Sequence, residues 1–255
     1  MILPNKKILV MGIRNRQSIA WHIAKTAVEQ GTQVFFTYST FEKEELMQEL
    51  MEELGAKRCV CDVASDSSIQ ECLEKVKAEF GKIDGLVHSI AHAHSKDLRA
   101  EFLHTSREGF CHATDVSAYS LLAVCQKAVE LDLFQENASI VTLTYLGAEK
   151  VVKDYKVMGV AKAALEASVR YLANDLGKRK IRINGISAGP IATLSSSGIQ
   201  NCEETLKLVE EKSPLHKNVT GEELGSAAAF LLSPMASAIT GEVLHVDNGF
   251  SIVAE

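Results

Sequence analysis

Short runs of apolar residues alternate with longer amphipathic segments along most of the chain. A short apolar run is typical of a buried strand, whereas apolar residues three and four positions apart are typical of a helix. Gly31, Gly55 and Gly81 follow three of the amphipathic segments, where glycine commonly ends a helix. We expect strands at residues 8–11, 33–38, 58–61, 86–89, 139–143, 182–186 and 242–246. We expect helices at residues 18–30, 42–54, 65–80, 105–131, 158–176 and 220–232, of which 105–131 admits a break.

The order of these elements predicts the fold class. Strands and helices alternate strictly, which is the pattern of a parallel sheet with right-handed crossover connections. We therefore expect an α/β protein with one Rossmann-type domain over residues 1–255, whose doubly wound, seven-stranded parallel sheet carries helices on both faces. One such domain can bury a full core at this length. Ligands of these folds bind beyond the carboxyl ends of the strands, so the residues after each strand are the candidates for a site.

Composition and charge exclude several classes of protein. The net charge of −6 and the mixing of both signs leave no basic tract of the kind that nucleic acid needs. No apolar stretch is long enough for a membrane span, and the first residues have too short an apolar run for a signal peptide. The six cysteines are scattered and form no CxxC pair, which is typical of buried thiols in a reducing compartment. We expect a cytoplasmic protein that binds neither nucleic acid nor membrane.

Tyr155 and Lys162 are the residues that most clearly indicate an enzyme. Their separation is nearly two helical turns, so on a helix both side chains would point to one face, about 20° apart. A phenol and an ammonium on one face can hold a substrate oxygen and a cofactor ribose together. Lys162 could instead be a surface lysine of a helix. Tyr145, ten positions before Tyr155, could serve packing alone.

The loop after the first strand is a candidate for binding a pyrophosphate. Gly12 follows that strand, and Ser18 with Ile19 opens the next helix. The backbone amides and the dipole at the start of a helix favour an anionic group. The loop lacks the G-x-G-x-x-G pattern, so an ordinary strand-to-helix connection is the alternative.

The residues after the third and fourth strands extend this candidate site. Asp62 could accept a hydrogen bond from the exocyclic amine of an adenine, with the apolar Val63 beside the ring. Asp62 could equally be a turn or cap residue. The segment Ser89-Ile90-Ala91 contains small residues, which would let the backbone approach a ligand closely.

Histidines raise the question of a metal site. No pair of them matches a zinc signature such as H-E-x-x-H. We therefore expect polar residues at the surface or at the rim of a pocket, and no bound metal. The histidines in question are His88, His92, His94, His104 and His112.

Together these segments resemble the enoyl-acyl-carrier-protein reductases of type II fatty-acid synthesis, a divergent branch of the short-chain dehydrogenase/reductase superfamily. The resemblance runs almost from end to end of the chain. Its most specific feature is the spacing Tyr-x9-Tyr-x6-Lys from Tyr145 through Tyr155 to Lys162, because ordinary members of the superfamily usually show Tyr-x3-Lys. The other matching segments are 12–21, 36–38, 61–63, 87–90, 144–149, 186–191, 240–242 and 245–250.

The resemblance implies reduction of a trans-2-enoyl thioester on acyl carrier protein, the last step of the elongation cycle. Hydride would pass from a reduced nicotinamide to the β-carbon, and the thioester oxygen would become an enolate. Tyr155 would donate to that oxygen, because its phenol keeps its proton at neutral pH and because charge that develops in the transition state is where a donor gains most. Lys162 would bind the ribose hydroxyls, and Tyr145 would line the pocket or assist the donor.

The same resemblance implies contacts around the nicotinamide and the acyl chain. Pro190, Ile191 and Thr193 would wrap the nicotinamide carboxamide. A mobile substrate-binding segment around residues 192–212 would cover the substrate and exclude water from hydride transfer. The residues expected to line the apolar slot are Ala93, Tyr145, Tyr155, Met158 and Ile199.

Ser39 bears on the choice between NADH and NADPH. It ends the second strand, where the resemblance places the adenosine 2′ position. Relatives that prefer NADPH often carry Arg-Lys there, whereas this chain has Ser39-Thr40. A 2′-phosphate without a cation would be poorly neutralised, which favours NADH. Arg14 could reach over from the first loop and reverse the preference, so NADPH is the alternative cofactor.

Partners and rival functions complete the predictions. By resemblance we expect a homotetramer, with the two long helices that begin near residues 105 and 158 buried between subunits. Acyl carrier protein is acidic, and the candidates for its dock are Lys207, Lys212 and Lys217.

A non-catalytic dinucleotide sensor should have lost Tyr155 or Lys162, and both are present. An alcohol or ketone dehydrogenase is the other rival, which the Tyr-x6-Lys spacing disfavours.

Overall fold

The computed structural model describes residues 1–191 and 202–253 of the chain. All seven predicted strands are present, and none of the described helices is long and apolar enough to cross a bilayer. The strands are β1 (Lys7–Met11), β2 (Gln33–Tyr38), β3 (Lys57–Val60), β4 (Ile83–His88), β5 (Phe134–Thr144), β6 (Arg182–Ala188) and β7 (Val243–Val246). The helices are α1 (Ile19–Glu29), α2 (Glu44–Leu54), α3 (Asp66–Phe80), α4 (Ser95–Arg99), α5 (Arg107–Thr114), α6 (Ser120–Glu130), α7 (Val157–Gly177), α8 (Cys202–Lys212) and α9 (Gly221–Leu232).

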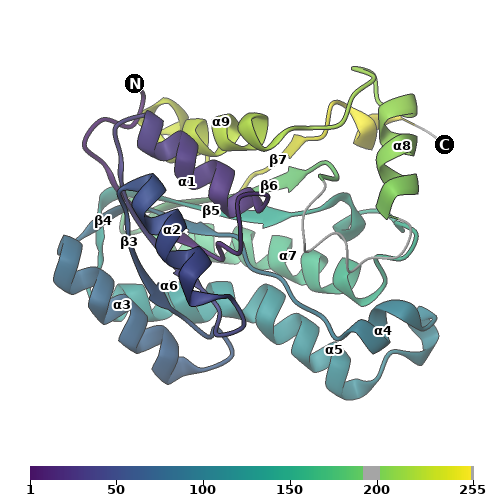
Figure 1. Cartoon of the computed structure of the whole chain (residues 1–255), viewed down its shortest axis with the longest axis horizontal. Helices are drawn as coiled ribbons and strands as arrows, with labels where there is room; N and C mark the ends of the chain where they lie inside the picture. Colours follow the sequence, from purple (N-terminus) through teal and green to yellow (C-terminus); the bar gives the residue numbers. More distant parts are fainter. Residues whose placement is uncertain (192–201, 254–255) are drawn as a thin grey trace.

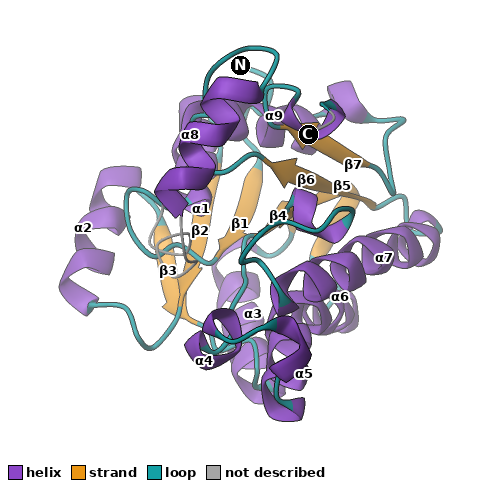
Figure 2. Cartoon of the chain, turned by 90° about the vertical axis from the view of Figure 1, so that its right-hand side faces the viewer, coloured by secondary structure: helices purple, strands orange, loops and turns teal. Residues whose placement is uncertain are grey.

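The seven strands form one parallel sheet in the order β3-β2-β1-β4-β5-β6-β7. Helices cover both of its faces, as Figures 1 and 2 show. The predicted fold class is therefore confirmed: one Rossmann-type domain with a doubly wound, seven-stranded parallel sheet.

A hydrophobic core lies on each face of the sheet. One face packs against α3, α6 and α7, and the other packs against α1, α2 and α9. Successive residues of β1 contribute to opposite cores, with Leu9 and Met11 in the first and Ile8 and Val10 in the second. Because both faces are covered, the strands are apolar on both sides, which explains why they appear in the sequence as continuous apolar runs.

From β1 the chain adds β2 and β3 on one side of the sheet, and it then returns to add β4 to β7 on the other side. The order of the strands therefore reverses between β1 and β4. In open sheets of this kind the crevice at such a point, beyond the carboxyl ends of the strands, is where ligands bind. Gly12 follows β1 with φ of +95°, and a Cβ atom built on it would lie 2.3 Å from the carbonyl oxygen of Ser89 after β4. Only glycine permits both this backbone conformation and this approach of the two loops.

The helical region from α5 to α6 is continuous but changes pitch. α5 runs into one π-helical turn, Asp115–Tyr119, which runs into α6. The predicted helical region over 105–131 is therefore present, and its irregularity is this wider turn. Within the turn, Ser117 Oγ accepts from the backbone N–H of His92 at 3.0 Å and contacts Met158 Sδ at 3.8 Å. Such π turns often occur at functional sites.

Two helices of the structure were not expected from the sequence. α4 has five residues, which is too short for a helical period to be recognised. It is joined to α5 by Asp97, whose Oδ1 accepts from both the backbone N–H and the hydroxyl of Ser106, at 2.9 and 3.0 Å. α8 forms the second part of the predicted substrate-binding segment 192–212. The first part of that segment, 192–201, lies outside the described residues.

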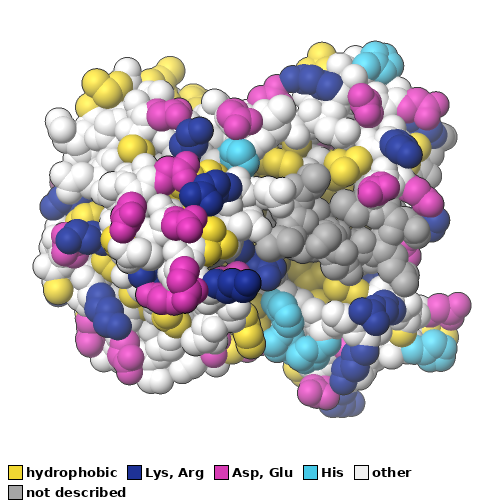
Figure 3. Space-filling view, in the orientation of Figure 1, with side chains coloured by type: hydrophobic (Ala, Val, Ile, Leu, Met, Phe, Trp, Pro, Cys, Tyr) yellow, Lys and Arg dark blue, Asp and Glu magenta, His cyan; other side chains and the backbone are white. Residues whose placement is uncertain are grey.

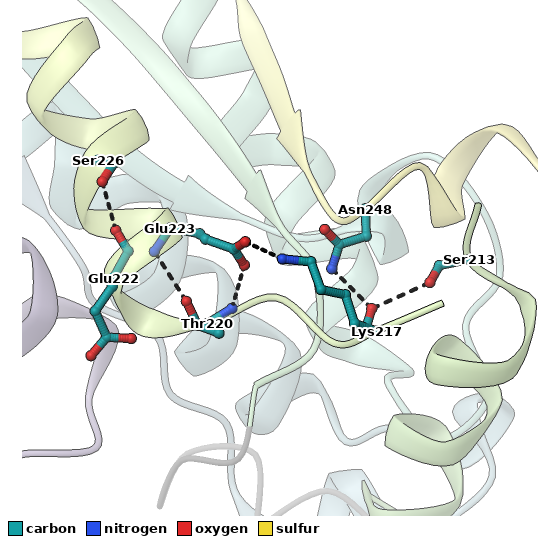
Figure 4. Close-up of polar contacts among 7 residues, drawn as sticks. All are labelled: Ser213, Lys217, Thr220, Glu222, Glu223, Ser226 and Asn248. Carbon is teal, nitrogen blue, oxygen red and sulfur yellow. Dashed lines mark hydrogen bonds and ion pairs between the residues drawn. The ribbon is translucent and has the colours of Figure 1, made fainter. Parts of the chain in front are cut away.

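The start of α9 is fixed by a capping box, shown in Figure 4. Thr220 Oγ1 accepts from the backbone N–H of Glu223 at 3.2 Å, and Glu223 Oε2 accepts from that of Thr220 at 2.9 Å. Lys217 Nζ donates to the same carboxylate through Oε1. The carbonyl oxygen of Lys217 accepts from Asn248 Nδ2 at 2.9 Å and from Ser213 Oγ at 3.2 Å. These contacts confirm Thr220 as the N-cap and tie the chain after β7 to the entry of α9.

Five of the six cysteines have described side chains; all five are free thiols, and four of them are buried. Cys59 on β3 and Cys72 on α3 bring their Sγ atoms within 3.1 Å of one another, and Cys61 and Cys125 are buried as well. Cys111 on α5 is exposed, so the expectation of burial is wrong for that residue.

Candidate active site

Tyr155 lies in the turn before α7 and not on the helix. α7 begins only at Val157, because Lys156 has φ of 47° and ψ of −122°, outside the helical region. The predicted sharing of one helical face by Tyr155 and Lys162 is therefore wrong. Two close approaches set the position of the Tyr155 ring instead. A Cβ on Gly147 would lie 2.4 Å from Tyr155 Cδ1, and a Cβ on Gly159 would lie 2.7 Å from the carbonyl oxygen of Gly147.

Tyr155 and Tyr145 form an aromatic pair beyond the carboxyl end of β5. Their ring centroids are 4.8 Å apart, and the ring planes meet at 68°. Tyr155 is only 8% exposed. Burial, and to a smaller extent the neighbouring Tyr145, raises the pKa of Tyr155 above its ordinary value. The phenol therefore keeps its proton at neutral pH and can serve as a hydrogen-bond donor.

Lys162 is buried against the end of β5, which rules out its interpretation as a surface lysine. Its Nζ donates to the carbonyl oxygen of Leu143 at 2.7 Å. Burial lowers the pKa of Lys162 to about 8, and the carboxylate of Glu166 partly opposes this effect. Glu166 Oε1 accepts from Thr144 Oγ1 at 2.7 Å, and burial raises the pKa of this carboxyl. α7 thus holds an ammonium and a carboxyl group one turn apart against the same strand end.

His88 is a buried, uncharged link at the centre of the sheet. Its Nδ1 lies 3.1 Å from Thr142 Oγ1 on β5, and its Nε2 lies 2.8 Å from Ser120 Oγ on α6. Burial, and then the positive charge of Lys162, lowers the pKa of His88 to about 3. The expectation that His88 is at the surface or at a pocket rim is wrong, because the side chain is fully buried.

An apolar cluster surrounds the two tyrosines. Ala93, Tyr155 and Met158 are buried members, and Tyr145 packs against them. The structure therefore brings together four of the residues predicted to line the acyl slot. Ile199 lies outside the described residues. The further buried members, which the sequence did not single out, are Leu98, Ala113 and Val157.

The predicted pyrophosphate end has the geometry of a capped helix start. Ser18 is the N-cap of α1, where its Oγ accepts from the backbone N–H of Trp21 at 3.3 Å and donates to the carbonyl oxygen of Asn15 at 2.7 Å. Ile19 is then the first residue of α1 and packs partly buried against the core on that face.

The end of β2 carries an ion pair near the predicted 2′ position. Arg14 Nε donates to Glu42 Oε1 at 2.7 Å, and Glu42 follows Ser39 in the loop after β2. Arg14 is 43% exposed and Glu42 is 10% exposed at their side chains. The cation that could have served a 2′-phosphate therefore has a carboxylate partner of its own.

Asp62 occupies a turn at the carboxyl end of β3. Its Oδ1 accepts from the backbone N–H of Ala64 at 3.0 Å, and its own N–H donates to Ser68 Oγ at 2.9 Å. The interpretation as a turn residue is thus correct in part. The side chain is also exposed beside the half-buried Val63, as a contact to an adenine requires.

The remaining predicted contacts follow β4 and β6. Ser89 and Ile90 are half-buried and Ala91 is exposed, directly beyond the end of β4. Pro190 is half-buried, and Ile191 packs against the core that contains α1. Thr193 lies outside the described residues.

Lys156 is a site residue that the sequence did not reveal. Its left-handed backbone turns the chain between Tyr155 and α7, and its Nζ donates to the carbonyl oxygen of Leu98 at 2.6 Å. A positive φ at lysine has no signature in the sequence, because lysine rarely adopts this conformation. Only the spacing of Gly147 and Gly159 around Tyr155 could have indicated a crowded turn.

Comparison with known proteins identifies close relatives over the whole length of the chain. The family model described as Enoyl-(Acyl carrier protein) reductase matches residues 12–251. The Enoyl-[acyl-carrier-protein] reductase [NADH] FabI of Bacillus cereus is 47% identical over 255 residues and 99% of each chain is covered. The Enoyl-[acyl-carrier-protein] reductase [NADPH] FabI of Staphylococcus aureus (strain MRSA252) is 46% identical over 254 residues, with 98% of each chain covered.

Solved structures agree with this similarity. The Bacillus cereus enoyl-acyl carrier protein reductase with NADP+ and indole naphthyridinone superposes with a TM-score of 0.96 at 46% identity, covering 100% of this chain and 99% of that one. The enoyl-[acyl-carrier-protein] reductase (NADH) of Aquifex aeolicus gives a TM-score of 0.96 at 42% identity and covers 100% of both chains.

Proposed function

The chain belongs to the enoyl-(acyl carrier protein) reductase family, and from that premise we propose which residues carry out its reaction and which cofactor serves it. The protein is an enzyme of fatty-acid synthesis that reduces trans-2-enoyl-[acyl-carrier-protein] to acyl-[acyl-carrier-protein] with a nicotinamide cofactor. The observation that supports the proposed site best is the buried, protonated Tyr155 in contact with Tyr145 at the strand ends that hold Lys162.

The crevice beyond β1 and β4 fits a dinucleotide. A Cβ on Gly12 would collide with the carbonyl oxygen of Ser89, so the glycine leaves the backbone bare where a pyrophosphate would approach. The capped start of α1 at Ser18 offers backbone amides to that anion. The adenine would be held by Asp62 and Val63. The rest of the dinucleotide would be flanked by two segments, Ser89-Ile90-Ala91 after β4 and Pro190, Ile191 and Thr193 after β6.

Tyr155 is proposed as the donor to the thioester oxygen. A bound reduced nicotinamide supplies the hydride that adds to the β-carbon of the substrate. Negative charge then develops on the thioester oxygen, and a preorganised donor in a water-poor site stabilises it far better than water does. The raised pKa of Tyr155 keeps the proton on the phenol, so the donor is present at each turnover. Met158 and Ala93 complete the apolar wall beside it.

Lys162 and Tyr145 are proposed to support this donor. Lys162 would bind the ribose hydroxyls, and the carbonyl oxygen of Leu143 holds its ammonium in place. The edge-to-face contact of Tyr145 with Tyr155 restricts the orientation of the Tyr155 ring. Tyr145 is therefore proposed as a positioning residue that also lines the acyl slot, with Ile199 on the segment that covers the substrate.

We propose NADH as the preferred cofactor. Ser39 supplies no positive charge at the end of β2, and Arg14, the cation that could reach over from the first loop, is paired with Glu42. A 2′-phosphate placed there would meet that carboxylate, whereas a ribose hydroxyl could donate to it. Relatives named for NADH and for NADPH are almost equally similar to this chain, so the overall identity does not decide between the cofactors.

The decisive experiment is a turnover assay with two substrates and two cofactors. We expect the purified chain to oxidise NADH in the presence of a crotonyl thioester of acyl carrier protein and to leave an acetoacetyl thioester unchanged. The value of kcat/KM should be higher with NADH than with NADPH. Turnover of the ketoacyl thioester instead would indicate a dehydrogenase, and an absence of turnover with both substrates and both cofactors would refute the proposed activity.

A single substitution tests the basis of the cofactor preference. Glu42→Gln removes the negative charge that neutralises Arg14, so we expect kcat/KM with NADPH to rise about tenfold relative to NADH, as a gain of one charge-assisted hydrogen bond would give. Glu45→Gln, at an exposed position in the first turn of α2, is the matched control and should leave the ratio unchanged. An unchanged ratio in Glu42→Gln would place the discrimination elsewhere.

A further inference from the structure

Three histidines that are distant in the sequence meet at one surface of the molecule. His92 and His94 lie in the loop after β4, and His112 lies on α5. Each offers a ring nitrogen, and these three atoms lie within 4.8 Å of one another. Figure 3 shows histidine side chains gathered on the surface in the region of α4 and α5, beside a hollow. The spacing of these histidines in the sequence matches no zinc signature, so the sequence predicts polar residues at the surface or at the rim of a pocket and no bound metal.

The fold presents His92 and His94 on the same side of their loop. Ala93 between them is buried in the apolar cluster of the active site, whereas the rings of His92 and His94 lie beside one another with centroids 6.0 Å apart. The backbone of His92 is held by Ser117, whose Oγ accepts from the His92 N–H at 3.0 Å and donates to its carbonyl oxygen at 3.2 Å. The π-helical turn that carries Ser117 therefore fixes the loop opposite His112.

The ring contacts within the cluster are close. His92 Nδ1 lies 2.7 Å from His112 Nε2, and the rings of His94 and His112 are stacked with centroids 4.2 Å apart and an angle of 14° between planes. Ligand nitrogens around a tetrahedral Zn²⁺ are about 3.3 Å apart, given Zn–N bonds of about 2.05 Å. Of the observed separations, 2.7 Å is shorter than this value and the upper bound of 4.8 Å is longer, so we expect the rings to shift when an ion binds.

Charged residues of both signs act on the cluster: acidic residues near His112 favour a bound cation, and a basic residue near His92 disfavours it. Glu108, Asp115 and Asp62 act on His112 with negative charge, whereas Arg14 acts on His92 with positive charge. Burial, and then the neighbouring imidazoles, lowers the pKa of both His92 and His112.

We propose that His92, His94 and His112 form a binding site for a borderline divalent transition-metal ion of the class of Zn²⁺, with water completing the tetrahedron. Three imidazoles and an open fourth position are a recurrent zinc environment. Imidazole also binds Co²⁺, Ni²⁺ and Cu²⁺, so the site selects a class of ion and not one element. His92 is exposed, which gives the ion a path from solvent.

The bound ion would join the β4 loop to α5. That loop begins with the proposed cofactor contacts Ser89, Ile90 and Ala91, so the metal would fix a segment of the crevice without taking part in the reaction. The ion replaces the hydrogen bond between His92 and His112. Because it binds only the folded arrangement, it should raise the melting temperature as its concentration increases.

Metal stoichiometry in the purified, untagged full chain tests the proposal. After dialysis against EDTA, we expect the protein to bind one equivalent of Zn²⁺ in competition with a chromophoric chelator. Co²⁺ in its place should give the strong visible bands of a tetrahedral site. His94→Asn and His112→Leu should each weaken Zn²⁺ binding at least about tenfold, since even residues that only orient metal ligands have effects of that size.

Matched controls separate this site from general metal binding. His104→Gln and His216→Gln change exposed histidines outside the cluster and should leave binding unchanged. Cys111→Ser tests the exposed thiol beside His112 and should also leave it unchanged. Melting curves in EDTA show whether each variant is folded. Less than one equivalent bound by the wild type, or undiminished binding in a His94→Asn/His112→Leu double variant, would overturn the proposal. These readouts need no turnover and are independent of the reductase assay.

Discussion

At the scale of the residue, burial decides which groups of the site carry a proton. It raises the pKa of Tyr155 and lowers that of Lys162 to about 8 and that of His88 to about 3. The phenol is therefore a reliable donor, the ammonium titrates near physiological pH, and the imidazole is neutral. These states follow from the depth of each side chain and from the groups beside it, which sequence spacing does not reveal.

Removal of the Tyr155 hydroxyl should affect chemistry and not cofactor binding. We expect Tyr155→Phe to lower kcat by about 10²- to 10³-fold, the usual effect of losing one donor to a developing oxyanion. The Kd for NADH should stay within a factor of about two, since the ring remains in place. Tyr171→Phe, which removes an exposed hydroxyl from α7, is the control and should be fully active. A Tyr155→Phe enzyme with near-normal kcat would exclude the phenol as the donor.

Lys162 should give the reaction a basic limb. As pH rises through about 8, the ammonium loses its proton and no longer offers a charged donor to the ribose. We expect kcat/KM for NADH to be level below this pH and to fall above it. Tyr155 adds no limb here, because its raised pKa keeps it protonated. A pH profile of kcat/KM measures the effect.

The matched variants for this profile lie on the same helix. Lys162→Met should lower kcat/KM about 10- to 100-fold, the value of one charge-assisted hydrogen bond, and should give a profile without the limb. Lys178→Met, at the exposed end of α7, should retain both the activity and the limb. If the limb persisted in Lys162→Met, another group would be responsible for it.

At the scale of the element, the turn between β5 and α7 is built around the ring of Tyr155. The short 3₁₀ segment Leu146–Ala148 crosses the start of α7 so closely that Gly147 and Gly159 leave no room for a side chain. The positive φ of Lys156 then ends the turn, and its Nζ binds the carbonyl oxygen of Leu98. The strain of this turn is retained at a place where the position of one hydroxyl matters.

Gly147→Ala should therefore displace Tyr155. The added methyl would lie 2.4 Å from the ring, so the ring must move, and a shift of about 1 Å in a reacting group can cost about 10²-fold in rate. We expect kcat to fall by that order and stability to fall by about 1–3 kcal/mol, as overpacking usually costs. Steady-state kinetics and urea unfolding measure the two effects.

The control is a glycine at the far end of α7, remote from the Tyr155 ring. Gly177→Ala places a methyl in open space at the end of α7 and should leave kcat unchanged. It should raise stability by about 0.5–1 kcal/mol, because alanine favours a helix over glycine. If Gly147→Ala kept full activity, the close contact with the ring would not govern the position of the donor.

At the scale of the whole molecule, exposed apolar side chains lie on the helices that we propose to bury between subunits. Tyr119 and Leu122 near the start of α6 are 49% and 41% exposed, and Val160 and Tyr171 on α7 are 36% and 78% exposed. These residues support the proposed homotetramer.

The candidates for the acyl carrier protein dock remain Lys207, Lys212 and Lys217, although Lys217 is already paired with Glu223.

A charge on this surface tests the assembly. We expect light scattering after gel filtration to give a tetrameric mass for the wild type and a smaller mass for Leu122→Glu, because an unpaired carboxylate in an apolar interface is costly. Met235→Glu, an equally drastic change at an exposed position outside these helices, should leave the mass unchanged. A monomeric wild-type chain would refute the tetramer.

The sequence by itself determined the architecture, because the pattern of apolar residues is a local property. Strands that helices cover on both faces appear in the sequence as apolar runs. The helices α3 and α9 have Ser65 and Thr220 as their N-cap residues, as the sequence predicted. The spacing from Tyr145 to Lys162 indicated the family. The strand-end rule identified the region of the site, since parallel strands bring their carboxyl ends to one edge.

Only the tertiary structure decided how the chemical groups are arranged. The turn at Lys156 takes Tyr155 off the helix, and burial sets the charge of Lys162 and His88. The meeting of His92 with His112 depends on the packing of a loop against α5. Such contacts join residues far apart in the chain, where no local period records them, and their energies depend on desolvation that exists only in the folded protein.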